Sequence, residues 1–338
     1  MKSIKCGVIG LGRIGKIHLE NLVKKINGVQ VLAAADVMSE GRALASKLEI
    51  KEVYEHAHEI IDHPEIEAVI ICSPTDTHAE YVKQSARQGK AIFCEKPLDL
   101  SIETVLEVLE VVRETGVPMM VGFNRRFDAN FSKIKELVAS KAAGQPHILK
   151  ITSRDPNPPP ISYIKVSGGM FLDMTIHDFD MARYIMGSEV TEVYTKATVL
   201  IDPEIGLAGD VDTAIITLTF ENGAIGVIDN SRSAAYGYDQ RIELFGSKGM
   251  VNIDNNHPDN HKYYSKENVS QSLPLNFFMD RYSDAYYREM QAFIDAIRQE
   301  EPMPVSGKDG LMSIAIGLAA RTSHLEQRAV KISEILKT

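Results

Sequence analysis

The chain has 338 residues, of which 44% are hydrophobic and 25% charged, values typical of a globular protein large enough for two domains. Its formal net charge of -9 argues against nucleic acid or an anionic membrane as a partner, because both need a basic surface. No apolar run reaches the ~18 residues of a membrane-spanning helix, and the N-terminus lacks an apolar signal-peptide core, so we expect a cytoplasmic protein.

The first predicted elements form a nucleotide-binding unit. An apolar strand, Ile4 to Ile9, runs into Gly10-Leu11-Gly12-Arg13-Ile14-Gly15 and then into a helix over about residues 16–26. The first glycine permits a tight turn, the second lets the backbone approach a pyrophosphate, and the third lets the helix pack on the strand. We therefore predict that this six-residue loop binds a dinucleotide.

A second strand, Val29 to Ala35, ends at Asp36, about 20 residues beyond the loop, where a carboxylate can bind both hydroxyls of an adenosine ribose. This carboxylate would repel a 2′-phosphate, and the following Val37, a further expected cofactor contact, and Met38 offer no cation. The sequence therefore favours NAD over NADP. Arg42 is the nearby cation that leaves NADP open.

The alternation of helices and strands continues to residue 122 and predicts a doubly wound parallel sheet. The expected elements are helix 39–48, a strand near residue 53, helix 56–63, strand 68–72, helix 77–88, strand 91–94, helix 102–115 and strand 118–122. Ligands of such sheets bind beyond the carboxyl ends of the strands. The cofactor contacts expected there are Cys72, Ser73, Pro74, Thr75, His78, Glu95, Lys96, Pro97 and Asn124. For His78, an ordinary place in the first turn of a helix is the alternative.

Lys96 is the candidate catalytic residue of this half. At a strand end and followed by Pro97, its amine would be held in place, and a fixed ammonium stabilises negative charge that develops on a reacting alcohol. An ordinary surface lysine is the alternative. The three cysteines, Cys6, Cys72 and Cys94, lie in apolar runs without CxxC spacing, so we expect buried thiols, no disulfide and no metal site.

The second half has the pattern of an α+β domain, and we place the domain boundary so that residues 1–122 and 123–338 form separate domains. After helix 130–140 and strand 147–154, Asp155-Pro156-Asn157-Pro158-Pro159-Pro160 predicts a stiff loop, either a pocket wall or a connector or oligomer contact. A helix carrying Asp173 follows. The later elements are strands 192–200, 213–220, 223–230, 240–246 and 249–253, which imply an antiparallel sheet, and helices 282–299 and 308–328.

Asp173 and His177 stand four residues apart on that predicted helix and so share one face, with Asp180 one turn further on. An acid so placed can orient an imidazole and raise its basicity while the imidazole takes a proton from substrate. Such a pair is also common on solvated helix faces. The catalytic interpretation is favoured only because the glycine loop and the Glu95-Lys96-Pro97 segment stand in the first half of the chain.

Three features in this order, Gly10-x-Gly12-x-x-Gly15, Glu95-Lys96-Pro97 and Asp173-x-x-x-His177, resemble the glucose-fructose oxidoreductase and inositol dehydrogenase family (Gfo/Idh/MocA) of NAD(P)-dependent enzymes. The chain is most similar to the inositol 2-dehydrogenases of that family, through residues 122–128, 153–160 and 173–180. The resemblance covers nearly the whole chain. It implies a Rossmann domain, then an α+β domain with a large open, mainly antiparallel sheet, and homotetramers packed sheet to sheet.

The resemblance also implies NAD-dependent oxidation of a ring polyol, with myo-inositol first and scyllo-inositol or a pyranose sugar behind it. Lys96 would bind the reacting hydroxyl, His177 would act as general base, and Asp173 would hold His177. The expected substrate contacts are Arg125, Asn157, Asp180 and Tyr236, with Tyr238 as the alternative to Tyr236. Functions of other classes that stay open are an NAD-dependent glycosidase of the same fold and an idle dinucleotide sensor.

Overall fold

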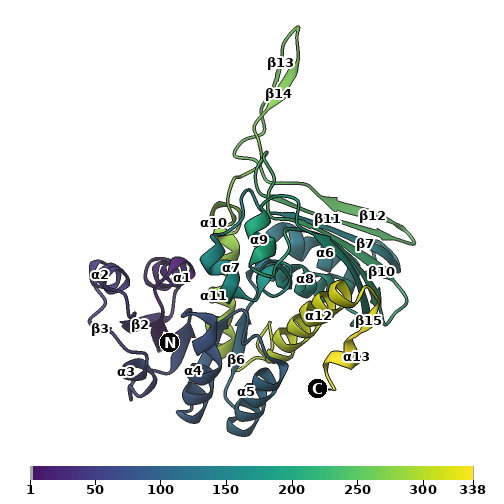
Figure 1. Ribbon diagram of the computed structural model, residues 1–338. Helices are drawn as coiled ribbons and strands as arrows, with labels where there is room; N and C mark the ends of the chain where they lie inside the picture. The colour runs from purple at the N-terminus through teal and green to yellow at the C-terminus, as the bar shows by residue number, and fades with distance from the viewer. Residues whose placement is uncertain (1–2, 338) are drawn as a thin grey trace. The chain divides into compact units, whose positions relative to one another are not determined.

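A computed structural model describes residues 3–337 and divides them into two compact units (Figure 1). The first unit comprises the described residues up to Phe127 together with Asp284–Met312, and the second comprises Asp128–Ser283 together with the described residues from Ser313. A segment near the C-terminus therefore packs with the N-terminal unit. The domain borders at residues 1–122 and 123–338 stay a prediction.

The first unit is built on a six-stranded sheet in the order β3-β2-β1-β4-β5-β6, with every neighbouring pair parallel. Its strands β4 and β5 are buried along their whole length, as expected for a parallel sheet covered on both faces. The predicted doubly wound Rossmann sheet is confirmed. The strands are β1 (Ile4–Ile9), β2 (Val29–Ala35), β3 (Glu52–Tyr54), β4 (Ala68–Ile71), β5 (Ala91–Glu95) and β6 (Met119–Gly122).

The helices of this unit begin and end within a few residues of their predicted bounds. One of them, α5, shows why: Ser101 Oγ accepts a hydrogen bond from the Thr104 N–H at its start, and Gly116 ends it with φ +68°. The helical elements are α1 (Arg13–Lys24), α2 (Ser39–Lys47), α3 (His58–Ile61), α4 (Thr75–Arg87), α5 (Ile102–Thr115), the 3-10 turn η1 (Asn124–Phe127) and α11 (Ser283–Gln299).

The second unit is built on a seven-stranded sheet in the order β12-β11-β7-β10-β9-β8-β15. Its neighbours are antiparallel except for β7 and β10, which run parallel because helices connect β7 to the strands that follow. The predicted mainly antiparallel sheet is confirmed. The strands are β7 (Pro146–Arg154), β8 (Val190–Thr198), β9 (Thr213–Phe220), β10 (Ile225–Ser231), β11 (Asp239–Gly246), β12 (Gly249–Ile253) and β15 (Val330–Lys331).

This sheet has one buried and one exposed face. Along β9, buried Ile216 and Leu218 alternate with exposed residues such as Ile215. Helix α8 (Ile176–Met186) packs on β7, and α6 (Ala129–Ala139) packs on α8. The remaining helices with residues in this unit are α7 (Ile161–Ser167), α9 (Pro203–Leu207), α10 (Phe278–Arg281), α12 (Gly307–Glu326) and α13 (Ile332–Ile335).

The single helix predicted around Asp173 was wrong. Asp173 lies in a π-helical turn, η2 (Met170–Met174), and α8 starts afterwards at Ile176. The turn is set by Gly168 and Gly169, which have φ +85° and +74°, and by the Met170 N–H, which donates to Asp210 Oδ1 at 2.9 Å. Asp173 and His177 are thus held by two consecutive elements, so the simple α-helical face expected from their spacing does not describe them.

A two-stranded hairpin, β13 (Lys262–Tyr264) with β14 (Val269–Gln271), projects from the second unit (Figure 1). All six of its strand residues are exposed, and no strand was predicted over these residues. Within residues 3–337, no helix combines the length and the apolar character needed to cross a membrane.

Candidate active site

The glycine loop between β1 and α1 is shaped by packing at two positions and left open at the third. Gly10 has φ +83°, and a Cβ there would lie 2.5 Å from the Ser73 nitrogen. A Cβ on Gly15 would lie 1.9 Å from the Gly10 oxygen, whereas a Cβ on Gly12 would meet no described atom within 4 Å. The space beside Gly12 fits the close approach of a pyrophosphate, as the predicted roles of the three glycines require.

Asp36 lies at the end of β2, beside this loop. Its Oδ2 accepts a hydrogen bond from the Leu11 N–H, and its Oδ1 accepts one from the Met38 N–H at 2.7 Å. A Cβ on Gly41 would lie 2.7 Å from the Asp36 Cγ, so the absence of a side chain there makes room for the carboxylate. The carboxylate is therefore fixed where an adenosine ribose is expected.

Arg42, the cation near Asp36 that was the reason to keep NADP as an alternative, already contacts other groups of the protein. Its Nη1 donates to the backbone oxygens of Asp36 at 2.7 Å and Val37 at 3.0 Å, and its Nη2 lies 3.6 Å from a carboxylate oxygen of Glu55. A guanidinium with these acceptors is not set up to receive a 2′-phosphate. The residues at this end of the sheet therefore fit NAD.

His78 joins the loop after β4 to the segment after β5. Its Nδ1 lies 2.7 Å from the Pro97 oxygen and its Nε2 lies 2.8 Å from the Ser73 oxygen. Burial lowers the pKa of His78, while its two backbone contacts oppose that shift. Both ring nitrogens thus face backbone carbonyls, and a cofactor contact through this residue stays a prediction.

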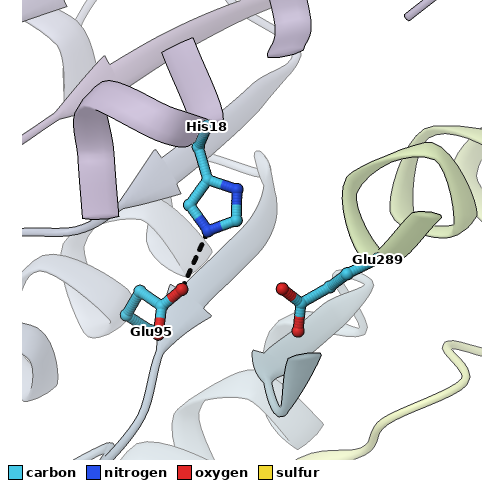
Figure 2. Close-up of side chains that lie close together, drawn as sticks. All are labelled: His18, Glu95 and Glu289. Carbon is cyan, nitrogen blue, oxygen red and sulfur yellow. Dashed lines mark hydrogen bonds and ion pairs between the residues drawn. The ribbon is translucent and has the colours of Figure 1, made fainter. Parts of the chain in front are cut away.

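Lys96 follows β5 and is half-buried. Its backbone N–H lies 3.3 Å from Glu95 Oε2, while Glu95 Oε1 lies 2.8 Å from His18 Nε2 on α1 (Figure 2). A Cβ on Gly122 would lie 3.0 Å from the Glu95 Cδ. Glu95, predicted to contact cofactor, therefore has its carboxylate directed into the protein interior beneath the Lys96 backbone.

In the second unit, Asp173 and His177 are both half-buried, and Asp173 has a partner that the sequence analysis missed. The hydroxyl of Tyr163, on α7, donates to Asp173 Oδ1 at 3.0 Å. Tyr163 is 47% exposed, so this pair borders solvent. No helix was predicted directly after the proline-rich loop, so neither α7 nor the role of Tyr163 was predicted.

The residues around His177 anchor the start of α8 to the sheet. Thr175 Oγ1 donates to Asn230 Oδ1 at 2.7 Å, and Asn230 Nδ2 donates to Asp178 Oδ2 at 3.0 Å and to the Ser153 oxygen at 3.1 Å. All four of these anchoring residues are buried. Asp180, a predicted substrate contact, is only 1% exposed, and that role stays a prediction.

Tyr236 is placed on a different face of this sheet. Its hydroxyl donates to Asp239 Oδ2 at 2.6 Å and accepts from Arg154 Nη1 at 3.1 Å, and Arg154 also pairs with Asp229. Because Asp229 directly precedes Asn230 in β10, its side chain points away from α8. The structure therefore does not bring the Tyr236 hydroxyl beside the Asn230 anchor. Tyr238, its alternative, is buried edge-on against Tyr282.

The remaining predicted contacts are divided between the units. Asn124 and Arg125 lie buried in η1 of the first unit. Asn157 is exposed in the proline-rich loop of the second unit, whose first residue, Asp155, is held by backbone hydrogen bonds to Ser231 and Ala234. The roles of these three residues stay predictions.

Known proteins resemble this chain over nearly its whole length. Residues 4–123 match the family described as "Oxidoreductase family, NAD-binding Rossmann fold", and residues 131–252 match "GFO/IDH/MocA C-terminal domain". A myo-inositol 2-dehydrogenase from Thermotoga maritima is 51% identical, with 98% of this chain and 100% of that protein aligned.

Two solved structures extend this likeness to three dimensions. A probable dehydrogenase from Thermotoga maritima superposes with a TM-score of 0.96 at 51% identity, covering 98% of this chain and 99% of that one. A scyllo-inositol dehydrogenase from Lactobacillus casei, with bound NAD(H) and scyllo-inositol, superposes with a TM-score of 0.92 at 29% identity, covering 98% and 100%.

Proposed function

Because the chain belongs to the GFO/IDH/MocA family of NAD-binding oxidoreductases, we propose that it oxidises a ring polyol with NAD, converting myo-inositol to 2-keto-myo-inositol (scyllo-inosose). The observation that carries this proposal is the 51% identity to the myo-inositol 2-dehydrogenase of Thermotoga maritima over nearly the full length of both chains. The open space beside Gly12 and the fixed carboxylate of Asp36 support NAD as the oxidant.

Bound NAD supplies the hydride acceptor for this reaction. The ammonium of Lys96 stabilises the negative charge that develops on the reacting oxygen, and His177 accepts the hydroxyl proton. Asp173 orients the imidazole, and Tyr163 holds Asp173 through the 3.0 Å hydrogen bond. A neutral His177 is required at the start of the reaction, so polyol oxidation rises with pH as this imidazole loses its proton.

The other assignments rest on the family resemblance. We assign cofactor binding to the loop Gly10 to Gly15 and to the residues around Asp36 and the ends of β4 and β5. We assign substrate hydroxyl contacts to Arg125, Asn157, Asp180 and Tyr236. A substrate contact through Tyr236 requires its hydroxyl to exchange the bond to Asp239 for one to substrate.

We further propose that the protein is a cytoplasmic homotetramer that serves inositol catabolism. Its apolar residues on the exposed face of the second unit's sheet support assembly through that face: Tyr194, Ile215, Ile225 and Phe245 are 40% to 53% exposed. The two family matches, of which one ends at residue 123 and the other starts at residue 131, support the division into domains at residues 1–122 and 123–338.

The proposal is tested by initial rates of NADH formation with NAD and, in parallel, myo-inositol, scyllo-inositol and glucose, repeated with NADP. We expect the highest kcat/KM with myo-inositol and NAD. The bound scyllo-inositol of the Lactobacillus casei relative makes that isomer the second candidate, and a higher kcat/KM for it would reassign the substrate. No NADH from any polyol would refute the proposal, and glycoside hydrolysis would then be assayed.

A further inference from the structure

The π-helical turn η2 buries all of its residues except Asp173, which is half-buried. The turn continues directly into α8, because the Thr175 N–H donates to the Met170 oxygen at 2.9 Å and α8 begins at the next residue. Buried neighbours on both sides leave the Asp173 backbone little freedom, so the conformation of the turn decides where this carboxylate points. π-helical turns are rare and are often found at functional sites. Groups that fix this turn therefore position the acid of the candidate site.

The start of the turn is bound by one carboxylate, that of Asp210. The Met170 N–H donates to both of its oxygens, at 2.9 Å and 3.0 Å. A Cβ on Gly169, which has φ +74°, would lie 2.6 Å from Asp210 Oδ1. The carboxylate thus occupies the space that a side chain at residue 169 would need, and it does so beside a backbone conformation that favours glycine. Asp210 therefore determines how the chain enters the turn.

Asp210 is itself bound to the sheet of the second unit. Arg232 follows β10 directly and is only 1% exposed, and its Nη2 lies 3.4 Å from Asp210 Oδ2. A guanidinium buried to this extent needs a carboxylate partner. The Arg232 N–H donates to the Asp212 oxygen at 2.9 Å, and the Asp210 N–H donates to the Ile205 oxygen at 3.1 Å. Side-chain and backbone contacts therefore both fix the position of the Asp210 carboxylate.

The segment between β8 and β9, residues 199–212, also supports Asp173 from a second side. The buried carboxylate of Asp212 accepts hydrogen bonds at 2.8 to 3.2 Å from the backbone N–H groups of residues 200–202, which folds the segment back on itself. Helix α9 of this segment packs against α7, which carries Tyr163, the donor to Asp173. One segment thus contacts both of the elements that hold the acid.

We propose that Asp210 is a positioning residue for Asp173. By binding the start of the π-helical turn, it sets the direction of the carboxylate that orients His177, and Arg232 keeps Asp210 in place. The link to catalysis rests on the proposed function, whereas the hold of Asp210 on the turn does not. Asp210 acts through Asp173 and takes no part in the proton transfer itself.

Hydrogen exchange tests the hold on the turn without any activity measurement. Mass spectrometry of a peptide that spans residues 168–175 follows it in the full chain. In Asp210→Ala the Met170 N–H loses its acceptor, so exchange in this peptide should become about tenfold faster at fixed pH. Unchanged exchange would overturn the proposal.

The matched control for this experiment is Asp128→Ala. Asp128 is a buried carboxylate of the same unit that also accepts from a backbone N–H, that of Phe131, and pairs with a buried arginine, Arg281. Its loss should lower the free energy of unfolding in the same way and leave exchange in the 168–175 peptide unchanged. If this control accelerated exchange as much as Asp210→Ala, general destabilisation would explain both results and the proposal would fail.

Steady-state kinetics separate positioning from a loss of stability. Asp210→Asn and Asp210→Ala both remove the ion pair with Arg232, but asparagine keeps an oxygen that can accept from the Met170 N–H. We therefore expect Asp210→Ala to lower kcat about 30-fold and Asp210→Asn only about threefold, with NAD affinity unchanged in both. Equal losses in the two variants, both shown to be folded by thermal unfolding, would contradict the role.

A double-mutant cycle identifies the residue through which Asp210 acts. In Asp173→Asn the positioned carboxylate is already gone, so adding Asp210→Ala should lower kcat further by no more than about twofold. A further loss as large as in the wild-type background would show that Asp210 acts elsewhere. A wild type without polyol oxidation would refute the proposed function instead, and hydrogen exchange would still decide whether Asp210 holds the turn.

Discussion

The two units hold their candidate residues by different kinds of contact. In the first unit, buried side chains bind the backbone at the strand ends: His78 reaches the Ser73 and Pro97 carbonyls, and Glu95 faces the Lys96 N–H. In the second unit, the candidate acid Asp173 is held by a side chain, because its Oδ1 accepts a hydrogen bond from the Tyr163 hydroxyl. The contacts in the first unit fix the backbone at the ends of β4 and β5, and the contact in the second unit fixes the orientation of the Asp173 carboxylate. Substitutions of the backbone-binding side chains His78 and Glu95 should therefore disturb fold and cofactor binding, and substitutions at Tyr163 or Asp173 should disturb turnover.

The largest expected effect is the loss of the proposed base. His177→Ala should lower kcat by roughly 100-fold to 10,000-fold, the range for removal of a general base, with little change in NAD affinity. Initial rates and an NAD titration measure the two quantities. His261→Ala, an exposed histidine of the same unit, is the control and should retain wild-type rates. A His177→Ala enzyme with more than a tenth of wild-type kcat would remove this residue from the mechanism.

Two glycines of the first unit should separate folding from cofactor binding. Gly15→Ala places a Cβ 1.9 Å from the Gly10 oxygen, so it should lower the free energy of unfolding by roughly 1–3 kcal/mol or more. Gly12→Ala meets open space and should leave the thermal midpoint nearly unchanged while weakening NAD binding about tenfold. Thermal unfolding and NAD titration of both variants check this. Equal destabilisation by the two substitutions would show that the space beside Gly12 is not kept for a ligand.

A smaller effect is expected at the solvent edge of the second unit. Tyr163→Phe removes the hydrogen bond to Asp173 and should lower kcat about fivefold. This corresponds to a rise of roughly 1 kcal/mol in the activation free energy, the size expected for a hydrogen bond to a carboxylate from a half-exposed side chain. Steady-state kinetics at several pH values measure it. Tyr263→Phe, on the exposed hairpin, is the control. Unchanged kcat in Tyr163→Phe would mean that Asp173 is oriented by other groups.

The smallest expected effect is a pH dependence of stability in the first unit. The pKa of His78 is lowered from 6.5 in the folded state. At a pH between the folded and unfolded pKa values, the unfolded chain therefore binds a proton at His78 that the folded chain does not bind. Stability should therefore fall as pH drops below about 6.5 toward the folded-state pKa. Denaturant unfolding across this window should show a smaller slope in His78→Asn than in wild type. A slope of the opposite sign would indicate that the ring is charged between its two carbonyls.

Local signals in the sequence predicted much of this structure. The glycine loop and the strands beside it have strong, short-range patterns, and β1, β2 and α5 lie at their predicted bounds. The π-helical turn at Asp173 was missed because it depends on Asp210, which is distant in sequence. The return of Asp284–Met312 to the first unit was missed for the same reason.

Long-range packing also explains what was not found in the candidate site. His18 and Glu289 are ordinary helix residues in sequence, and only the folded sheet brings them to Glu95. In sequence, Tyr236 is only a tyrosine near a predicted strand. The register of β7 with β10 is needed to show on which face of the sheet its partner Arg154 lies. Residue type and spacing can predict a chemistry, whereas such partners require the tertiary structure.

The most direct test of the proposed function follows the hydride itself. The enzyme is incubated with NAD and myo-inositol that carries deuterium at carbon 2, and the reduced cofactor and the product are analysed by mass spectrometry. We expect deuterium on the nicotinamide ring, a slower rate than with unlabelled inositol when hydride transfer limits turnover, and a ketone at carbon 2. Reduced cofactor without deuterium would contradict oxidation at that carbon, and the absence of any reduced cofactor would contradict inositol oxidation altogether.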